Sequence, residues 1–282
     1  MDKIKGISAS RGIAKGKVHI EQLKELNEIE EKKISESEVD KEVESLGKAI
    51  DRAKEELKEI KEKTKDEVGD KEAEIFQAHL MFLDDPEFTG KMKEKIKEEK
   101  FSAETAVTKV MNKYVTMFEN MDNEYMKARK TDIEDVSRRI IDKLKGSETK
   151  GSDFAKNTVV IAKDLTPSMT ASLDKDKIVA FATAVGSRTS HTAIMSRSLG
   201  IPAIVGTGEE ILEAVKEGDK VIVDGSSGEL IVKPDQQTLE EYDEKIAEYE
   251  KKLTLLEKYK DKKAKTKDGE EIEVAGNIGN IA

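Results

Sequence analysis

Apolar residues recur at alternating spacings of four and three along the first third of the chain. They stand at Val39, Val43, Leu46, Ile50, Ala53, Leu57 and Ile60. This heptad-like pattern predicts a long amphipathic helix, and Ser35-Glu36-Ser37-Glu38 before it fits a capping box. Further helical patterns continue to Leu144, and Gly146 follows them. We therefore expect an all-helical bundle over residues 31–145, with short connections that favour antiparallel packing.

Strand patterns lie on both sides of this helical region. The predicted strands are residues 16–20, 159–162, 178–182, 203–205, 221–223 and 230–232. Helical segments separate several of them, which is typical of an α/β domain. Because the early strand needs a sheet to join, the economical arrangement is one discontinuous α/β domain of residues 1–30 and 146–235. The helical bundle is then an insertion in that domain.

The C-terminal region begins with another apolar repeat of threes and fours, from Leu239 to Leu256. It predicts a long linker helix over residues 236–265. Lys267-Asp268-Gly269-Glu270 looks like a hairpin turn that starts a new strand. That strand has little left to pair with, so we expect residues 266–282 to be the truncated start of a further domain.

Composition narrows the classes of function. The 282 residues are 39% charged with a net charge of −10, whereas a nucleic-acid binder would carry a basic footprint. An acidic surface instead attracts a basic protein partner. The absence of cysteine excludes disulfides and thiolate chemistry. Neither a membrane span nor the apolar region of a signal peptide is present, so we expect a cytoplasmic protein without membrane insertion.

Residues 186–208, GSRTSHTAIMSRSLGIPAIVGTG, place one of only three histidines at the start of a predicted helix. Gly200 and Pro202 end that helix, so His191 falls in its first turn. Unsatisfied amides point outward there, which suits an anion and disfavours a protonated imidazole. A neutral imidazole keeps the lone pair that nucleophilic attack requires.

A phosphoryl group on His191 would bring about two negative charges to this helix end. Backbone amides, the hydroxyls of Thr189, Ser190 and Thr192, and the guanidinium of Arg188 are suited to bind them. Phosphoryl transfer needs mostly positioning and charge neutralisation, and this stretch offers both without a cluster of metal ligands. From the local pattern alone, an ordinary capped or partly buried histidine remains the alternative.

The same stretch resembles the phosphohistidine signature of phosphoenolpyruvate-utilising enzymes, in which the phosphorylated histidine follows a glycine and a small residue. Ser187 stands where that family usually has Gly or Ala, and Arg11 replaces a usual proline near the N-terminus. Within the group, the chain resembles the N-terminal half of enzyme I of the bacterial phosphoenolpyruvate:sugar phosphotransferase system. The stretches that carry this resemblance are residues 6–17 (GISASRGIAKGK), 75–81 (IFQAHLM), 164–168 (DLTPS), 186–208 and 274–279 (VAGNIG).

The resemblance implies a swivelling phosphohistidine α/β domain, an inserted helical subdomain that binds the carrier protein HPr, and a long connector helix. His191 would accept the phosphoryl group on Nε2 and pass it to HPr. Thr166 matches the threonine whose hydroxyl bonds the other ring nitrogen, which would fix the tautomer. The alternative for Thr166 is a turn residue before Pro167.

The helical insert also supplies positions that resemble the family's HPr contacts. They are Asp70, Glu74, His79, Met81, Phe82, Glu87 and Arg129. Exposed Met and Phe would form an adaptable apolar patch, and acidic residues would steer a basic carrier toward it. The alternative places Met81 and Phe82 in the helical core, leaves the acidic residues facing water, and makes His79 a packed residue.

In the family, phosphoenolpyruvate and Mg²⁺ bind a C-terminal barrel that also drives dimerisation. We expect this chain to need no cofactor and no metal, and to be a monomer where the full-length protein is a homodimer. It should exchange phosphate reversibly with HPr and should not phosphorylate itself from phosphoenolpyruvate alone. One alternative is the phosphohistidine domain of a dikinase or phosphoenolpyruvate synthase. Another is a non-catalytic coiled-coil scaffold with an α/β head.

Overall fold

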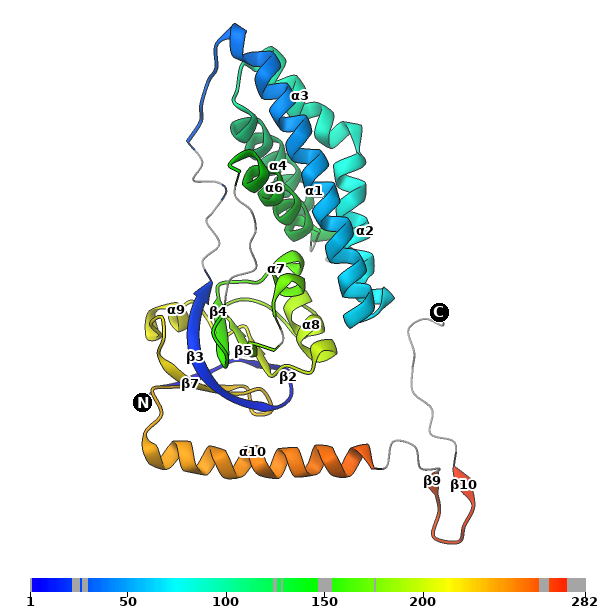
Figure 1. Cartoon of the computed structure of the whole chain (residues 1–282), viewed down its shortest axis with the longest axis vertical. Helices are drawn as coiled ribbons and strands as arrows, with labels where there is room; N and C mark the ends of the chain where they lie inside the picture. The colour runs from blue at the N-terminus through cyan, green and yellow to red at the C-terminus, as the bar shows by residue number, and fades with distance from the viewer. Residues whose placement is uncertain are drawn as a thin grey trace. The chain divides into compact units, whose positions relative to one another are not determined.

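The structure is a computed structural model in which the chain divides into two compact units, Met1–Pro234 and Asp235–Ala282. It describes residues 2–21, 26, 30–123, 126–127, 129–146, 154–174, 176–258 and 264–272. Figure 1 colours the chain from blue at the N-terminus to red at the C-terminus. The predicted mixture of α and β structure is confirmed.

Five helices in the described residues of the first unit pack into a bundle. They are α1 (Val39–Glu67), α2 (Asp70–Asp84), α3 (Pro86–Glu99), α4 (Ala103–Glu119) and α6 (Lys130–Leu144). The predicted seam of α1 is buried at Leu46, Ala53 and Leu57, each with no exposed surface. In the predicted capping box, the Glu38 carboxylate accepts the backbone amide of Ser35 at 2.8 Å. Burial of this stripe against the other helices stabilises α1 more than intrinsic propensity does.

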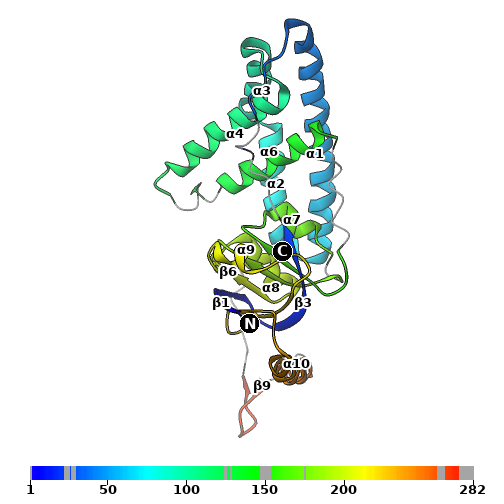
Figure 2. The same ribbon diagram turned by 90° about the vertical axis from the view of Figure 1, so that its left-hand side faces the viewer.

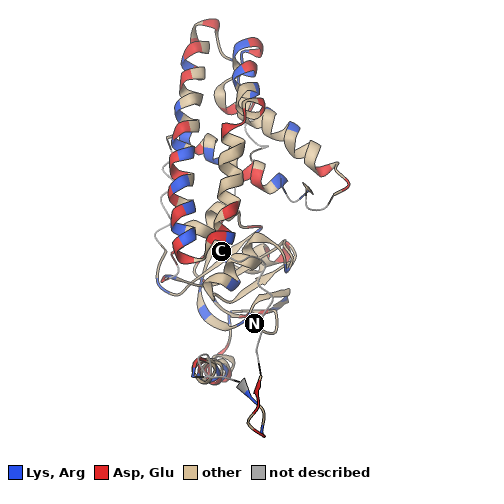
Figure 3. Cartoon of the chain, turned by 90° about the vertical axis from the view of Figure 1, so that its right-hand side faces the viewer, with Lys and Arg blue, Asp and Glu red and all other residues tan. Residues whose placement is uncertain are grey.

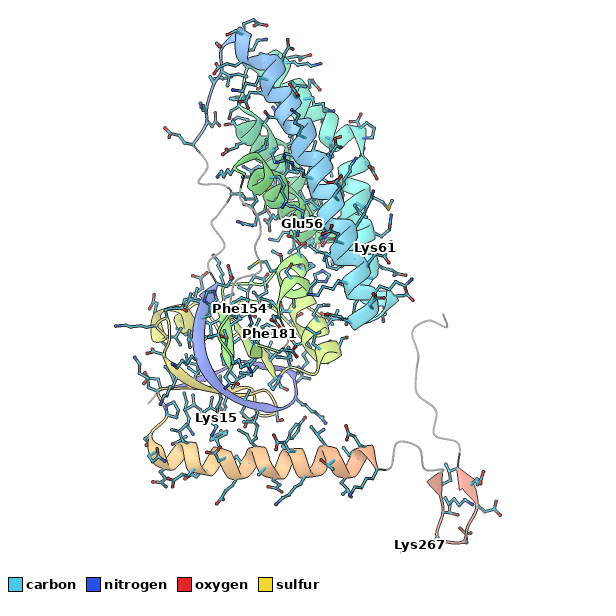
Figure 4. All side chains as sticks on the ribbon, in the orientation of Figure 1. Lys15, Glu56, Lys61, Phe154, Phe181 and Lys267 are labelled. Carbon is cyan, nitrogen blue, oxygen red and sulfur yellow. The ribbon has the colours of Figure 1, made fainter. Side chains whose placement is uncertain are left out.

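An ion-pair cluster also joins two helices of the bundle. Glu56 on α1 lies 2.6 Å from the Arg139 guanidinium and 2.7 Å from the Lys143 ammonium, both on α6 (Figure 4). Figure 3 marks acidic and basic positions along the ribbon and shows both signs on the helices of the bundle, whereas most of the sheet domain is uncharged in that view.

The other part of the first unit is an eight-stranded sheet. Its strands are β1 (Asp2–Lys5), β2 (Ile7–Ser10), β3 (Ile13–Glu21), β4 (Thr158–Ala162), β5 (Ile178–Thr183), β6 (Ala203–Val205), β7 (Lys220–Asp224) and β8 (Glu229–Val232). Their spatial order is β1-β8-β7-β3-β4-β5-β6-β2. Strands β3, β4, β5 and β6 run parallel, and the remaining neighbours are antiparallel. The pairing of β3 with β4 brings together the two ends of the chain segment that holds the helices (Figures 1 and 2).

This sheet closes on itself through one glycine. Strands β1 and β2 stand at opposite ends of the order, yet only Gly6 separates them in the chain. The Gly6 amide donates to the Gly228 carbonyl at 2.9 Å. A Cβ at position 6 would lie 2.6 Å from Ile204 Cγ2 and 2.9 Å from the Val205 carbonyl oxygen. Only glycine allows so close an approach of the chain to these strands, so Gly6 permits the turn that joins the two end strands.

Helices pack on both faces of the sheet, and two helices of the sheet domain also contact the bundle. Phe154 and Phe181 belong to the cluster under α8 (His191–Leu199) (Figure 4), while α9 (Glu210–Ala214) packs on the other face. Ala171 of α7 (Pro167–Ser172) and Met195 of α8 belong to the core of the bundle instead. The bundle and the sheet domain therefore share apolar packing at α7 and α8.

The second unit contains α10 (Gln236–Glu257) and a hairpin of β9 (Ala264–Lys265) and β10 (Glu271–Ile272). The Asp235 side chain caps α10 by accepting the Thr238 amide at 2.8 Å. The predicted helix was too long at its C-terminal end, because Ala264 and Lys265 form a strand. The predicted turn is present between β9 and β10, and β9 supplies the pairing partner that the sequence analysis did not find. Residues 274–279 lie outside the described part of the chain.

None of the helices in the described ranges has an apolar stretch long enough to cross a lipid bilayer.

We predict that Gly6→Ala destabilises the protein by roughly 1–3 kcal/mol, because the added methyl group must displace strand atoms. Gly47→Ala is the matched control, since a Cβ there in the middle of α1 meets nothing within 4 Å. It should raise stability by up to about 1 kcal/mol, because glycine is a poor helix former. Urea denaturation followed by circular dichroism measures both, and equal stability of the two variants would contradict closure through Gly6.

Candidate active site

His191 is the first residue of α8, as the sequence predicts. The extended backbone of Ser190 precedes it, and the Ser190 hydroxyl oxygen accepts the Ala193 amide at 3.4 Å. Gly200 ends the helix in the left-handed conformation, with φ of 70°. The short helix therefore presents its first turn, with His191, at the end that faces the bundle.

The imidazole of His191 meets a buried acid from the bundle. Its Nε2 lies 3.9 Å from Oδ1 of Asp132 on α6, and the His191 side chain is 38% exposed whereas that of Asp132 is 1% exposed. The other carboxylate oxygen, Oδ2, accepts a hydrogen bond from the Arg129 guanidinium at 2.8 Å. The site is thus assembled from two parts of the chain, the sheet domain and the helical bundle.

A cleft of about 720 Å³ opens in front of this pair. Glu74 on α2, Arg129 and Asp132 line its bundle side, and Thr189 and His191 line its other side. Because the cleft is open and His191 is only partly covered, a side chain from another molecule can reach the ring.

Burial sets the electrostatics of the pair. Burial lowers the pKa of His191 from its ordinary 6.5, and the Asp132 carboxylate opposes this shift. Burial alone would raise the pKa of Asp132, yet this pKa lies below the ordinary 3.8 because His79 and Arg129 favour the carboxylate. The result is a neutral imidazole beside an ionised acid at neutral pH.

Thr166 lies at the start of a helix of the sheet domain. Thr166 is the N-cap of α7, and its hydroxyl oxygen accepts the Met169 amide at 3.3 Å. Within the described residues, no hydrogen bond joins it to His191. A nearby hydroxyl, that of Thr192, donates to the Leu165 carbonyl at 3.2 Å, which ties α8 to the turn before α7.

The other residues predicted around His191 lie on the loop before α8. Arg188 is exposed, and its carbonyl oxygen accepts the Arg197 guanidinium at 3.0 Å. The Thr189 hydroxyl lies 3.0 Å from that of Ser187 and borders the cleft. Ser190 uses its hydroxyl in the cap and donates it to the Ser187 carbonyl at 2.9 Å. Arg188 and Thr189 therefore keep groups available at the surface, while the Ser190 hydroxyl is committed to the loop.

The residues predicted for partner binding separate into exposed and buried groups. Asp70, Glu74, Met81 and Glu87 are exposed, with Met81 at 65%. Phe82 is partly buried against the bundle core. The Arg129 guanidinium donates a hydrogen bond to Asp132. His79 has no exposed surface, so any part it plays in binding is indirect.

Sequence reasoning missed the buried acids of α6. Asp132 and Asp135 are 0% and 4% exposed, on the same helix as the fully buried Ile133 and Val136. The available signal was their spacing, since both acids fall within the apolar pattern of this helix. Among the described residues, no group of three or more His, Cys, Asp and Glu side chains is arranged to hold a metal ion.

Comparison with known proteins agrees with this architecture. The family model described as PEP-utilising enzyme, N-terminal, matches residues 5–129, and that of the PEP-utilising enzyme, mobile domain, matches residues 154–228. The solution structure of an Enzyme I (nEIt) is 46% identical with a TM-score of 0.71, and the match covers 88% of this chain and 99% of that one. The N-terminal domain of Enzyme 1 – Nitrogen has the same fold, with 24% identity, a TM-score of 0.60 and coverage of 86% and 99%.

Curated relatives give the same result. The phosphoenolpyruvate-protein phosphotransferase of Bacillus subtilis is 44% identical over 280 residues, which are 99% of this chain and 48% of that protein. That of Staphylococcus aureus is 44% identical over 277 residues, with 98% and 48% covered. The fold is thus that of the N-terminal and mobile domains of phosphoenolpyruvate-utilising enzymes. The chain belongs to the enzyme I family within that class, and it spans about half the length of these curated relatives.

We predict that the pKa of His191 lies below 6.5 and that Asp132→Asn lowers it further, because the carboxylate stabilises the protonated ring. NMR titration of the His191 ring measures both values. Asp40→Asn is the matched control, since it removes the same charge from the first turn of α1, at the end of the bundle away from the sheet domain (Figure 1). A higher pKa in Asp132→Asn, or equal shifts in both variants, would contradict the assigned electrostatics.

Proposed function

We propose that this chain is the phosphoryl-carrying half of a phosphoenolpyruvate-protein phosphotransferase, and that His191 holds the phosphoryl group on Nε2 before it passes to HPr. The observation that carries the proposal is a neutral, partly exposed imidazole at a helix N-terminus beside an open cleft. The relatives that match nearly the whole chain are named for this activity.

The transfer step follows from the state of the ring. In the forward direction, the Nε2 lone pair attacks phosphorus as the bond from phosphorus to the enolate oxygen of phosphoenolpyruvate breaks. That bond's electron pair stays on the oxygen. With HPr, the imidazole of the carrier attacks instead, and the electron pair of the broken N–P bond returns to His191. A lowered pKa keeps His191 neutral at neutral pH, so the lone pair is available throughout.

The groups that would bind the phosphoryl oxygens lie next to His191 in the chain. Arg188 and Thr189 lie on the loop before α8, and Ser190 holds the first turn in place. Thr166 would serve through the second lone pair of its hydroxyl oxygen, which accepts only the Met169 amide among the hydrogen bonds described for it. That oxygen would accept the Nδ1–H of His191 and leave Nε2 unprotonated.

The remaining parts of the chain have roles in this proposal. The helices inserted between β3 and β4 form the HPr-binding subdomain, with Asp70, Glu74, Met81 and Glu87 on its surface. Phe82 packs beneath that surface, while His79 is buried and Arg129 donates a hydrogen bond to Asp132. The sheet domain swivels to present His191, and α10 connects it to a further domain that binds phosphoenolpyruvate with Mg²⁺ and forms the dimer. The chain alone would be a cytoplasmic monomer without a cofactor of its own.

We predict that radiolabelled phospho-HPr transfers acid-labile label to this chain and that His191→Ala abolishes the labelling. His19→Ala is the matched control. It removes another partly exposed histidine, one that lies on β3 and is held by Glu217 at 3.1 Å. Labelled phosphoenolpyruvate alone should give no label, because this chain spans about half the length of the relatives named for that activity. Labelling of His191→Ala by phospho-HPr would contradict the assignment of His191 as the phosphorylated residue.

A further inference from the structure

A fully buried histidine stands behind the proposed site. His79 on α2 lies between two acids of α6, with its Nε2 3.4 Å from Asp132 Oδ1 and its Nδ1 3.9 Å from Asp135 Oδ2. The side chains of the three residues are 0%, 1% and 5% exposed. Apolar residues of similar size would stabilise a bundle core at least as well as a buried charged cluster. Stability alone therefore does not explain the cluster, which points to a functional role.

The two oxygens of Asp132 are not equally held. Oδ2 is fixed by the Arg129 guanidinium at 2.8 Å. Oδ1 is buried without an aligned hydrogen bond, and it lies between two imidazoles, 3.4 Å from Nε2 of His79 and 3.9 Å from Nε2 of His191. His79 and His191 therefore compete for one carboxylate oxygen.

The imidazole that donates a hydrogen bond to Oδ1 determines whether Nε2 of His191 keeps its lone pair. If Oδ1 turns to His191, it accepts a hydrogen bond from Nε2–H and stabilises that tautomer, so the attacking lone pair is lost. If Oδ1 stays with His79, Nε2 of His191 remains unprotonated. The longer distance to His191 in the structure corresponds to the second arrangement.

Asp135 lies on the other side of His79. The Asp135 carboxylate lies near Nδ1 and also accepts the backbone amide of Ser168 at 3.1 Å. Ser168 belongs to the first turn of α7 in the sheet domain. The two His79 nitrogens have no aligned hydrogen bond, so His79 faces the two acids by proximity and charge, and Asp135 is itself anchored across the contact between the bundle and the sheet domain.

We propose that His79 is a positioning residue that holds Oδ1 of Asp132 away from His191 and so keeps Nε2 of His191 free to attack phosphorus. The inference rests on the proposed function, because it concerns the nitrogen that takes the phosphoryl group. His79 touches neither the phosphoryl group nor the carrier. During transfer from phospho-HPr, the N–P bond to His191 forms as the N–P bond of the donor breaks, and no proton passes through His79.

Two amide substitutions separate this role from simple packing. The side-chain amide nitrogen of His79→Gln takes the place of Nε2 and can still donate to Asp132. That of His79→Asn takes the place of Nδ1 and reaches only toward Asp135. The two variants have the same chemistry and similar size, and thermal unfolding verifies that both fold.

In phosphoryl exchange with phospho-HPr, we expect His79→Asn to lower the transfer rate constant by about tenfold or more, with an unchanged KM because His79 is buried. His79→Gln should stay within about threefold of the wild type, as expected for a conservative replacement that keeps the contact. The ¹⁵N shifts of the His191 ring should move toward the Nε2–H tautomer in His79→Asn alone.

A double-mutant cycle with Asp132→Ala tests the route of the effect. If His79 acts through Asp132, His79→Asn should have little further effect in the Asp132→Ala background. An equal loss in both backgrounds, equal losses in the Asn and Gln variants, or an unchanged His191 tautomer would overturn the proposal. Failure of the wild type to take label would count against the proposed function instead, and the ¹⁵N shifts would still decide the role of His79.

Discussion

The contact between Asp132 and His191 is the interaction on which the site depends, because it is where the bundle meets the histidine of the sheet domain. Its geometry requires α6 and α8 to approach each other, and several contacts hold them there. Ala171 and Met195 contribute to the bundle core, and Asp135 accepts an amide from α7. The same packing that stabilises the first unit therefore creates the chemical environment of the ring.

That environment balances two opposing demands. The ring must be covered enough to remain neutral, yet open enough for a carrier to reach Nε2, and 38% exposure beside an open cleft meets both. The Asp132 carboxylate offsets part of the lowering of the His191 pKa by burial. The same carboxylate can also accept a hydrogen bond from Nε2–H and so favour the tautomer without the reacting lone pair. In the role proposed for His79, its position 3.4 Å from Oδ1, with Oδ2 held by Arg129, resolves this conflict.

The sequence predicted the parts of this structure that are encoded locally. The seam of α1, the capping box at Ser35 and the position of His191 all follow from short-range spacing, and the structure contains each of them. The cluster of His79 with the α6 acids did not follow, because it forms only when helices more than 50 residues apart in the chain pack together. The end of α10 and the closure of the sheet at Gly6 likewise depend on pairing with distant strands.

The proposed chemistry depends on which nitrogen of His191 carries the proton. Long-range ¹H–¹⁵N correlation of the His191 imidazole at neutral pH measures this directly. The predicted result is a neutral ring that carries its proton on Nδ1, so that Nε2 shows the shift of an unprotonated nitrogen. A proton on Nε2, whether in the other neutral tautomer or in a doubly protonated ring, would contradict the account.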